Sequence, residues 1–568
     1  GNSTNGTGLQ LKGTNTLNAT NGSISLTGNS TNGTGLFLGG NKTLSASNGS
    51  INLTGSSTKG VGLYLGENNS TNTLNATNGS INLNGVSVAG VAVQIRATNT
   101  LTADNINLTG NSTNGMGIDV QWASNTLTAT NGSINLTGNS QKGVGLQLKG
   151  NTNSFWNITG TGNASITGIS QGSNGVDRIN INASGLNGTT TLTGIAMGNG
   201  NGVNLNKNTL INVTVNGSAT GNGSGVGISG DSTLTNTTVN GNGVSGAGVS
   251  ISGNLSNSGN STVTGNASGN GNGVNISGNI TDGVISGSAT GNGSGVDISG
   301  NSTLINTTVN GNGTDGAGVS ISGNLSNAGN STVTGNASGN GTGVDINGTV
   351  TGGDITGNAS GNGNGVNISG NITDGVISGS ATGNGAGVDI SGNSTLINTT
   401  VNGNGTDGAG VSISGNLSNA GNSTVTGNAS GNGNGVNISG NITGGVISGH
   451  AVNGNGVEYT GPSTLTNATV SGTSVHGYDV KEYLQDAIQQ HARSTQAALA
   501  ELRAEGSQVT ETSGYRPETR TLTISVCDEE NNCSRNTVLS SAEADVQPPY
   551  SHTDVAAKPM TPGSEKKR

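Results

Sequence analysis

The chain has 568 residues, of which 106 are Gly, 8% are charged and 2% are aromatic. Its length would ordinarily correspond to about three or four globular domains, but 29% apolar residues are too few to fill that many cores. Disordered chains are rich in charge and Pro, whereas this chain has few charges and six Pro. The remaining possibility is a periodic structure that needs few apolar side chains per unit.

The formal net charge of -10, from 28 acidic and 18 basic residues, removes the basic surface that phosphate binding requires. We therefore expect no nucleic-acid partner. The chain contains no apolar run of the roughly 18 residues that span a bilayer, so we expect no membrane-spanning segment. It begins with Gly1 and no charged and apolar leader precedes the repeats, which predicts a fragment or a mature product.

The composition changes near the C-terminal end. All six Pro, both Cys and 25 of the 46 charged residues (28 acidic plus 18 basic) follow Val457. This change predicts a boundary near residues 458 to 475, with a C-terminal tail over residues 461–540 and a disordered end over residues 541–568.

An internal repeat covers the rest of the chain. Gly-x-Gly is followed by an aliphatic residue, any residue and a second aliphatic residue, at intervals of 27 to 30 residues up to Val203 and of 21 to 25 after it. These intervals define residues 1–205, with coils of about 27 residues, and residues 206–460, with coils of about 23. The first aliphatic positions are Leu9, Leu36, Leu63, Val91, Ile118, Leu146, Val176, Val203, Val226, Val249, Val274, Val296, Val319, Val344, Val366, Val388, Val411, Val436 and Val457.

Each period offers three short segments in which apolar residues alternate with Ser, Thr or Asn. In the first regime these include Thr-Leu steps at Leu17, Leu44, Leu74, Leu101 and Leu127, and the pairs Ile24/Leu26, Ile51/Leu53, Ile81/Leu83 and Ile134/Leu136. Alternation is typical of strands with one buried face, and Asn-Gly steps supply the corners. We predict an all-β chain folded as a right-handed parallel β-helix of about 18 coils with 21–30 residues each.

Part of the repeat is duplicated. Residues 295–341 and 387–433 are identical, displaced by 92 residues, or four coils. Recombination of whole coils is the simplest origin. Such lengthening would disturb an enzyme's site but only extend a stalk, so it favours a structural role.

Motifs that could indicate a cofactor, metal or catalytic site have simpler structural interpretations. The Gly-rich runs at Gly271–Gly273 and Gly361–Gly365 lack the helix that follows a dinucleotide-binding turn. Asp297, Asp345 and Asp389 are single residues within strands and do not form calcium-binding nonapeptides. Catalysis would need clustered carboxylates, and Asp345 and Asp354 are the nearest candidates in sequence. We predict no catalytic residues, cofactor or metal.

Three aromatic residues of the repeat have two readings. Trp122, Phe155 and Trp156 can stack on a sugar face, or they can fill an irregular coil as a side-chain plug. The plug is the favoured interpretation.

The chain contains 52 Asn-x-Ser/Thr triplets among its 88 Asn. One interpretation is that Asn and Thr both suit corners and ladders; the other is that exposed Asn residues are glycosylated in a secreted setting. Candidate glycosylation sites are Asn18, Asn29, Asn52, Asn107, Asn135, Asn157, Asn212, Asn306, Asn330 and Asn398.

The tail predicts a small α/β segment. Residues 479–505 read as a helix, with Asp479 as a capping residue and His491 on its periodic face. Strands over residues 519–528 and 533–539 form a hairpin that brings Cys527 and Cys533 together. Two Cys without a further metal ligand nearby fit a disulfide loop formed outside the cytoplasm, with free thiols as the alternative.

Long β-helical repeats rich in Asn, Gly, Thr and Ser, followed by a short tail with a Cys pair, resemble the two-partner secretion exoproteins of Gram-negative bacteria. These are the filamentous haemagglutinin and high-molecular-weight adhesin families. The resemblance implies a C-terminal fragment whose Cys527–Cys533 loop holds it at an outer-membrane secretion pore. It also implies simple sugars on some of the candidate Asn residues, added by a glycosyltransferase.

The first hypothesis for function is a secreted, cell-surface-anchored adhesin. Its β-helical stalk would mediate attachment through a host surface receptor or glycan. The alternatives are a β-helical enzyme acting on polysaccharide and the stalk of a contact-dependent growth-inhibition exoprotein.

Overall fold

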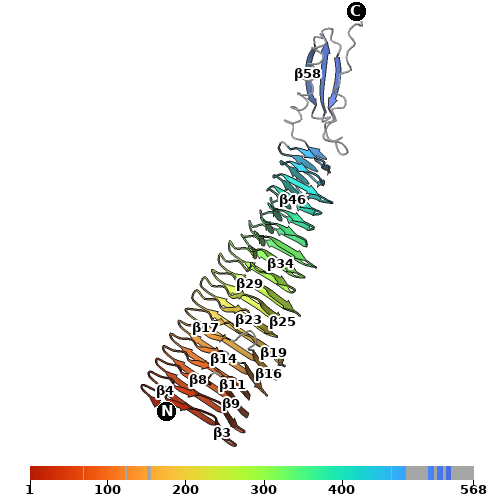
Figure 1. Ribbon diagram of the computed structural model, residues 1–568. Coiled ribbons are helices and arrows are strands. Elements are labelled where there is room, and N and C mark those ends of the chain that lie inside the picture. Colours follow the sequence, from red (N-terminus) through yellow and green to blue (C-terminus); the bar gives the residue numbers. More distant parts are fainter. Residues whose placement is uncertain are drawn as a thin grey trace, which may run out of the picture. The chain divides into compact units, whose positions relative to one another are not determined.

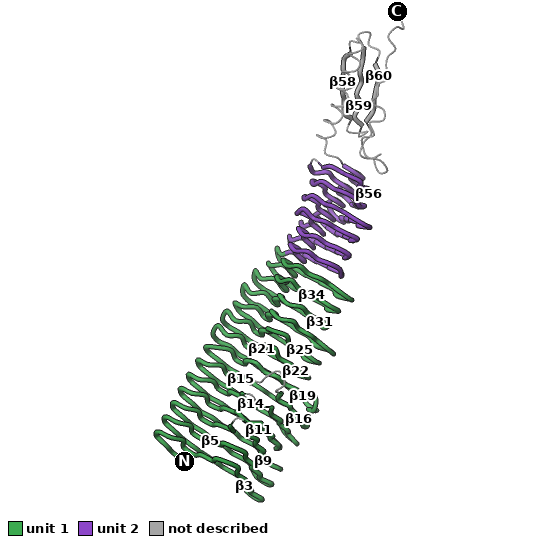
Figure 2. The backbone as a smooth tube through the Cα atoms, viewed as in Figure 1, with its two compact units in different colours: residues 1–341 green, residues 342–568 purple. Residues whose placement is uncertain are grey.

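The computed structural model describes residues 1–67, 69–121, 124–149, 155–461, 463–481, 509–516, 521–528 and 533–538. The chain divides into two compact units, Gly1–Gly341 and Thr342–Arg568 (Figure 2). The described residues form strands and no helix. This confirms the expectation of an all-β, right-handed-type parallel β-solenoid, with about 20 coils where we expected about 18.

In unit 1, each coil contributes one short strand to a parallel ladder (Figure 1). These strands carry the repeat's aliphatic pair: in β8, Leu63 and Leu65 are buried, and Tyr64 between them is half-buried. The short strands of unit 1 are Leu9–Leu11 (β2), Leu36–Leu38 (β5), Leu63–Leu65 (β8), Val93–Ile95 (β10), Ile118–Gln121 (β12), Leu146–Lys149 (β15), Val176–Asp177 (β18), Val203–Asn206 (β21), Val226–Ser229 (β24), Val249–Ile251 (β27), Val274–Ile276 (β30), Val296–Ile298 (β33) and Val319–Ile321 (β36).

A second set of strands follows the short strands around a corner. It aligns the Thr-Leu steps as predicted, with Leu17 opposite Leu44 and Leu101 opposite Leu127. Its members in unit 1 are Asn15–Ala19 (β3), Lys42–Ala46 (β6), the first parts of Thr71–Ser87 (β9) and Thr98–Ser112 (β11), Asn125–Ala129 (β13), Trp156–Gly160 (β16), Ile181–Leu186 (β19), Thr209–Ile211 (β22), Ser232–Thr235 (β25), Leu255–Ser258 (β28), Ile280–Thr281 (β31), Ser302–Ile305 (β34) and Leu325–Ala328 (β37).

The third set shows the period-2 burial that the sequence predicts. In β7, Ile51, Leu53, Gly55 and Ser57 are buried while the intervening residues are half-buried. Besides the second parts of β9 and β11, the set in unit 1 contains Asn2–Ser3 (β1), Ile24–Ser30 (β4), Ile51–Ser57 (β7), Ile134–Ser140 (β14), Ala164–Ser170 (β17), Thr190–Ala196 (β20), Thr214–Ala219 (β23), Thr238–Gly243 (β26), Thr262–Ala267 (β29), Val284–Ala289 (β32), Thr308–Gly313 (β35) and Thr332–Ala337 (β38).

The interior leaves no room for a side chain where the third strand of a coil passes the start of the next short strand. A Cβ on Gly55 would overlap the carbonyl oxygen of Gly62. Ser57 closes the same corner, because its Oγ donates to the carbonyl of Gly33 at 2.7 Å and accepts from the Gly60 amide at 2.8 Å. The recurrent Gly and Ser are therefore requirements of packing and backbone hydrogen bonding.

One repeat position differs from the sequence prediction. The register pairs Val93, and not Val91, with Leu63 on one side and Ile118 on the other. Ala92 replaces the second Gly of the motif, so Gly-x-Gly is absent here and the aliphatic pair begins two residues later than predicted. The intervals on the two sides of Val93 are therefore 30 and 25 residues.

Unit 2 also contains coils. Its short strands are Val344–Ile346 (β39), Val366–Ile368 (β42), Val388–Ile390 (β45), Val411–Ile413 (β48), Val436–Ile438 (β51), Val457–Tyr459 (β54) and Val480–Lys481 (β57). The strands of its other two sets are Val350–Thr351 (β40), Asp354–Ala359 (β41), Ile372–Thr373 (β43), Val376–Ala381 (β44), Ser394–Ile397 (β46), Thr400–Gly405 (β47), Leu417–Ala420 (β49), Thr424–Ala429 (β50), Ile442–Thr443 (β52), Val446–Ala451 (β53), Leu465–Thr466 (β55) and Thr469–Ser474 (β56).

The solenoid of unit 2 continues to Lys481, beyond residue 460, where we expected the tail to begin. Val480 pairs with Val457 in the parallel ladder. Lys481 Nζ lies 2.7 Å from Glu458 Oε1 and joins the last two coils with an ion pair. Asp479 does not cap a helix, because its Oδ1 accepts from the Ser474 amide at 2.8 Å and strand β57 follows it.

The remaining described strands form an antiparallel sheet of three strands. Val509–Arg516 (β58) pairs with Thr521–Asp528 (β59), which pairs with Cys533–Val538 (β60). The last two strands match the predicted hairpin, and β58 is an addition to it. The rest of the predicted helix, residues 482–505 including His491, and the predicted disordered end, residues 541–568, lie outside the described residues.

Candidate functional site

The outward side chains of the third set form polar columns in unit 1. Each column places one residue per coil in parallel register, at a spacing of about 4.8 Å. The central column contains only hydroxyl and amide side chains: Thr27, Thr54, Asn84, Thr109, Thr137, Thr167, Thr193, Asn216, Asn240, Thr264, Ser286, Asn310 and Thr334.

A neighbouring column is a hydrogen-bonded Asn ladder. Asn82 Nδ2 donates to Asn52 Oδ1 at 2.8 Å, Asn107 Nδ2 to Asn82 Oδ1 at 2.9 Å, and Asn135 Nδ2 to Asn107 Oδ1 at 3.1 Å. Three of these four Asn are candidate glycosylation sites. Their amides therefore already join neighbouring coils, as the structural interpretation of the triplets requires.

The candidate glycosylation sites fall into different environments. Asn52, Asn107 and Asn157 are half-buried, whereas the other seven are exposed. Among the exposed ones, Asn212, Asn306 and Asn398 occupy corners with positive φ of 57°, 49° and 48°. Asn tolerates this left-handed backbone better than most residues. The same triplet thus serves both ladders and corners, and all three corner side chains are exposed, as is the ladder residue Asn135.

Carboxylates occur among the middle residues of the short strands, but they are bound by amides of the same surface. Asp177 accepts from Asn204 Nδ2 at 2.6 Å and from Gln147 Nε2 at 3.2 Å, on the coils to either side. Burial raises the pKa of the Asp297 carboxyl, although hydroxyls of Ser320 and Ser299 oppose the shift. The carboxylates are therefore spread along the solenoid as single charges.

The two acids closest in sequence are not brought together as a pair. Asp345 lies on the short strand β39 and binds Asn347 Nδ2 at 3.0 Å, whereas Asp354 begins β41 in another set. Asp389, like Asp297, has its pKa raised by burial, opposed by a hydrogen bond from Ser412. Among the residues that the structure describes, no group of three or more His, Cys, Asp or Glu is placed to hold a metal ion.

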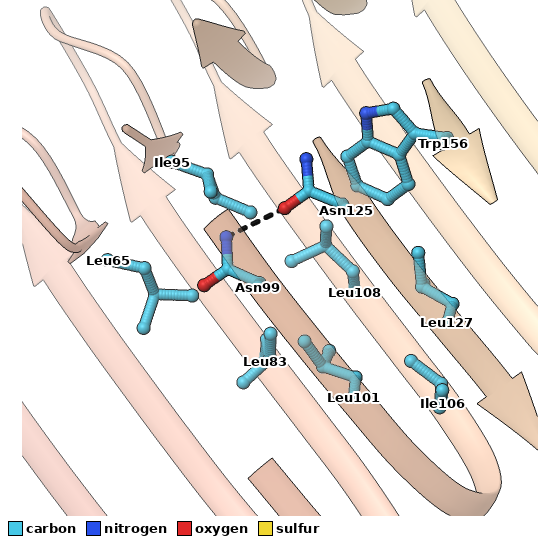
Figure 3. A pocket seen from close by; sticks show the side chains of 10 residues that line it. All are labelled: Leu65, Leu83, Ile95, Asn99, Leu101, Ile106, Leu108, Asn125, Leu127 and Trp156. Atoms are coloured by element: carbon cyan, nitrogen blue, oxygen red, sulfur yellow. Dashed lines mark hydrogen bonds between the residues drawn. The ribbon is translucent and has the colours of Figure 1, made fainter. Parts of the chain in front are cut away.

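The aromatic residues near the irregular coil confirm the plug interpretation for Trp156. Its side chain is 4% exposed and aligns with Asn125 of the preceding coil. Figure 3 shows Trp156 beside Asn125, which accepts a 2.8 Å hydrogen bond from Asn99, in a small interior pocket lined mostly by Leu and Ile. Phe155 is half-buried, and Trp122 lies outside the described residues.

A cluster that the sequence analysis missed joins three successive coils of unit 1. The ring centroids of Phe37 and Tyr64 are 5.1 Å apart, with their planes tilted by 53°. The Arg96 guanidinium carbon lies 5.8 Å from the centroid of the Tyr64 ring. The available signal was an aromatic residue at the middle position of two consecutive short strands, followed one coil later by a lone Arg.

The predicted Cys pair lies in the antiparallel sheet. The register places Cys527 directly opposite Cys533. Residues opposed in this way have Cα atoms about 4.5 to 5.5 Å apart, within the range that disulfides bridge. The disulfide itself stays a prediction.

Comparisons with known protein families and with curated proteins found no match for the chain. Within the described part of the chain, no helix has the length and apolar character needed to cross a membrane.

Proposed function

We propose that the chain is a segment of a secreted, surface-anchored bacterial adhesin, in which the solenoid is a stalk that carries a binding surface. The observation that supports this proposal is the ladder of unit 1, in which most coils repeat a buried aliphatic pair and a polar outward column. Such a surface is built by stacking and tolerates the addition of coils. The identical segments 295–341 and 387–433 support this reading.

The C-terminal part would keep the adhesin at its outer-membrane secretion pore. The opposed positions of Cys527 and Cys533 support a closed loop of the kind that the resemblance implies. Thiol labelling of the secreted protein tests this proposal. Labelling of both Cys without reductant would contradict the loop, and labelling only after reduction would support it.

Attachment to host cells is the test of the adhesin proposal. Beads coated with the purified chain are expected to bind epithelial cells above beads coated with an unrelated protein of equal net charge. A version with the solenoid scrambled coil by coil, which keeps the composition and loses the register, is the matched control. Equal binding of all three beads would contradict the proposal.

We also propose that a dedicated glycosyltransferase adds sugars to the chain. The exposed Asn212, Asn306 and Asn398 at corners give such an enzyme access to the amide. The intact mass of the protein from its native host is expected to exceed 55.0 kDa by whole sugar units. A mass equal to that of the bare chain would remove this part of the proposal.

A further inference from the structure

We propose that Arg96 and Tyr64 form an anion-binding site on unit 1 that takes the carboxylates of a linear acidic polysaccharide built from uronic acids. The inference rests on the proposed binding function and specifies its ligand. The site is built by register: Phe37 aligns with Tyr64, Tyr64 aligns with Gln94, and Arg96 follows two residues after Gln94. The ring of Tyr64 thus lies between Phe37 and the Arg96 guanidinium.

Arg96 has no acceptor within the described part of the chain. The residue is half-buried, and its Nε is sealed from solvent without a hydrogen-bond partner. A charged donor left in this state costs free energy that the fold does not recover. The guanidinium carbon lies 5.8 Å from the centroid of the Tyr64 ring, so a cation–π contact holds the cation over the ring. A fixed, unpaired guanidinium is suited to bind a carboxylate through two parallel N–H groups.

The carboxylates of the neighbouring coils are directed elsewhere. Asp119, in register with Gln94, accepts from Gln94 Nε2 at 3.3 Å and from Gln121 Nε2 at 2.6 Å. Glu67 follows the short strand that carries Tyr64, but its side-chain oxygen lies against Gly39, one coil further from Arg96. Its charge acts on Lys42, whose pKa it raises against the stronger lowering by burial. The single ion pair among the described residues is that of Lys481 with Glu458, so Arg96 is left for an external anion.

Further cations follow the short strands at the same end. Lys12 comes directly after β2, Arg178 directly after β18 and Lys207 directly after β21, and all three are exposed. Arg178 and Lys207 share a left-handed backbone, with φ of 51° and 57°. Three coils separate Arg96 from Arg178, a distance of roughly 14 Å along the ladder. Two carboxylates lie on the short strands between Arg96 and Arg178: Asp119 is 2% exposed, and Asp177 accepts from Asn204 Nδ2 at 2.6 Å and from Gln147 Nε2 at 3.2 Å.

The spacing of these cations indicates a chain-like ligand. A small anion would reach only Arg96, whereas a polysaccharide lying across the coils would place successive carboxylates near Arg96, Arg178 and Lys207. Nucleic acid fits poorly, because few basic residues are present in a chain of net charge -10. A neutral glycan would leave the Arg96 guanidinium without its acceptor.

Calorimetry with oligogalacturonate tests the site, and its methyl ester serves as a ligand of the same length without charge. The wild-type chain is expected to bind the acid form and not the ester. Arg96→Gln is expected to weaken binding by about tenfold or more, and Tyr64→Leu is expected to weaken it through loss of the cation–π contact. Lys59→Gln and Lys142→Gln remove exposed charges that follow the third set of strands, so they are the matched controls.

Circular dichroism and melting temperature verify that each variant keeps the fold. Equal binding of acid and ester, or equal loss in Arg96→Gln and Lys59→Gln, would overturn the proposal. Binding of monomeric galacturonate as tight as that of the oligomer would overturn the polysaccharide assignment. Cell attachment is measured separately: an Arg96 site that binds oligogalacturonate in a chain that attaches to no cells would refute the adhesin function and leave the site.

Discussion

Lys42 occupies an interior position that Asn fills on the neighbouring coils. The register aligns it with Asn15 on one side and Asn72 on the other, and it is 2% exposed. Its Nζ donates to the carbonyls of Gly13, at 2.5 Å, and Gly39. Burial lowers the pKa of Lys42, and the charge of Glu67 opposes the shift only in part. The fold therefore carries a buried charge where an amide would fit.

Lys42→Asn is expected to stabilise unit 1 by about 1 kcal/mol. The new amide can donate to Asn72 Oδ1, which is buried without a partner, and so extend the ladder in which Asn72 donates to Asn99 at 3.0 Å. Urea unfolding at pH 7 measures the change. Lys59→Asn, at an exposed position, is the control, and a lower midpoint for Lys42→Asn than for this control would contradict the argument.

The same variant changes the pH dependence. Because the folded-state pKa of Lys42 lies below its unfolded value of 10.5, the unfolded chain binds more protons between these two values. Stability of the wild-type chain is then expected to rise as the pH increases from the folded-state pKa toward 10.5. Lys42→Asn is expected to lose this rise.

Asn306 is expected to matter through its backbone. Its φ of 49° is costly for a residue with a Cβ other than Asn or Asp. Asn306→Ala should destabilise by about 1 kcal/mol, whereas Asn306→Gly, which adopts positive φ freely, should cost less. Thermal unfolding of the two variants provides the measurement. An Ala variant at least as stable as the Gly variant would show that the corner is not strained.

Glycan occupancy is expected to separate corner Asn from ladder Asn. Asn107 is half-buried, and its amide donates to Asn82 at 2.9 Å and accepts from Asn135 at 3.1 Å. The corner residues Asn306 and Asn398 also donate to the preceding coil, but their side chains are exposed. Glycopeptide mass spectrometry of the native protein should find sugar on Asn212, Asn306 and Asn398 in preference to Asn52, Asn107 and Asn157. Higher occupancy of the ladder Asn would refute this ordering. Sequence could not supply the distinction, because both groups share one triplet.

At the scale of elements, a partly buried carboxyl on a short strand makes stability depend on pH, and a single substitution can remove this dependence. Asp297 stands where the preceding coil has Asn275, and burial raises the pKa of its carboxyl despite hydrogen bonds from Ser320 and Ser299. Between the unfolded pKa of 3.8 and the raised folded value, the native state binds more protons, so stability falls as the pH rises. The full free-energy cost of burying the charge is present above the raised folded-state pKa.

Asp297→Asn is expected to raise the urea midpoint at pH 7 and to remove the fall in stability above pH 3.8. The matched variant Asp389→Asn tests the equivalent strand of unit 2, where burial also raises the pKa. Asp315→Asn, at an exposed position, is the control. A midpoint that falls in Asp297→Asn at pH 7 would mean that the carboxylate is net favourable.

The features of the coils that could be predicted from the sequence are those that close packing requires. Gly and alternating aliphatic residues mark the strands because backbones meet at Gly55 and side chains fill the interior at Leu63 and Leu65. The signal fails where packing tolerates substitution: Ala92 permits a coil without its second Gly, so two Val fit the pattern and only Val93 is fully buried. It fails again at the last coil, where Tyr478 and Asp479 precede Val480 without Gly-x-Gly.

The candidate site was less predictable than the coils. Phe37, Tyr64 and Arg96 are about 30 residues apart in sequence and meet only because the coils stack in register. Which residues lie side by side depends on the residue at which each short strand begins. If this short strand began at Val91 instead of Val93, Arg96 would be shifted by two positions relative to Tyr64. Contacts between coils thus depend on the register of neighbouring strands, and the sequence pattern of a single coil does not determine that register.

At the scale of the whole molecule, the duplicated region is longer than the identical segments 295–341 and 387–433. Residues 264–341 and 356–433 differ only at Ser294 and Ala386. In each copy this position lies three residues before a half-buried Asp, Asp297 or Asp389. Because the two copies carry the same coil sequences, the chain contains a set of coils that can be removed without creating a new neighbouring sequence.

Deleting residues 295–386 removes 92 residues and joins Ser294 to Gly387, which restores the sequence that follows Ser294 in the intact chain. Stability in solenoids is a sum over coils and their nearest neighbours. The variant should therefore unfold within about 4 °C of the intact chain, with a denaturant slope reduced in proportion to the residues lost. Deleting residues 295–374 instead joins Ser294 to Gly375 and interrupts a coil, so a broad or lower transition is expected. If both deletions unfold alike, coil register does not govern the stability of this chain.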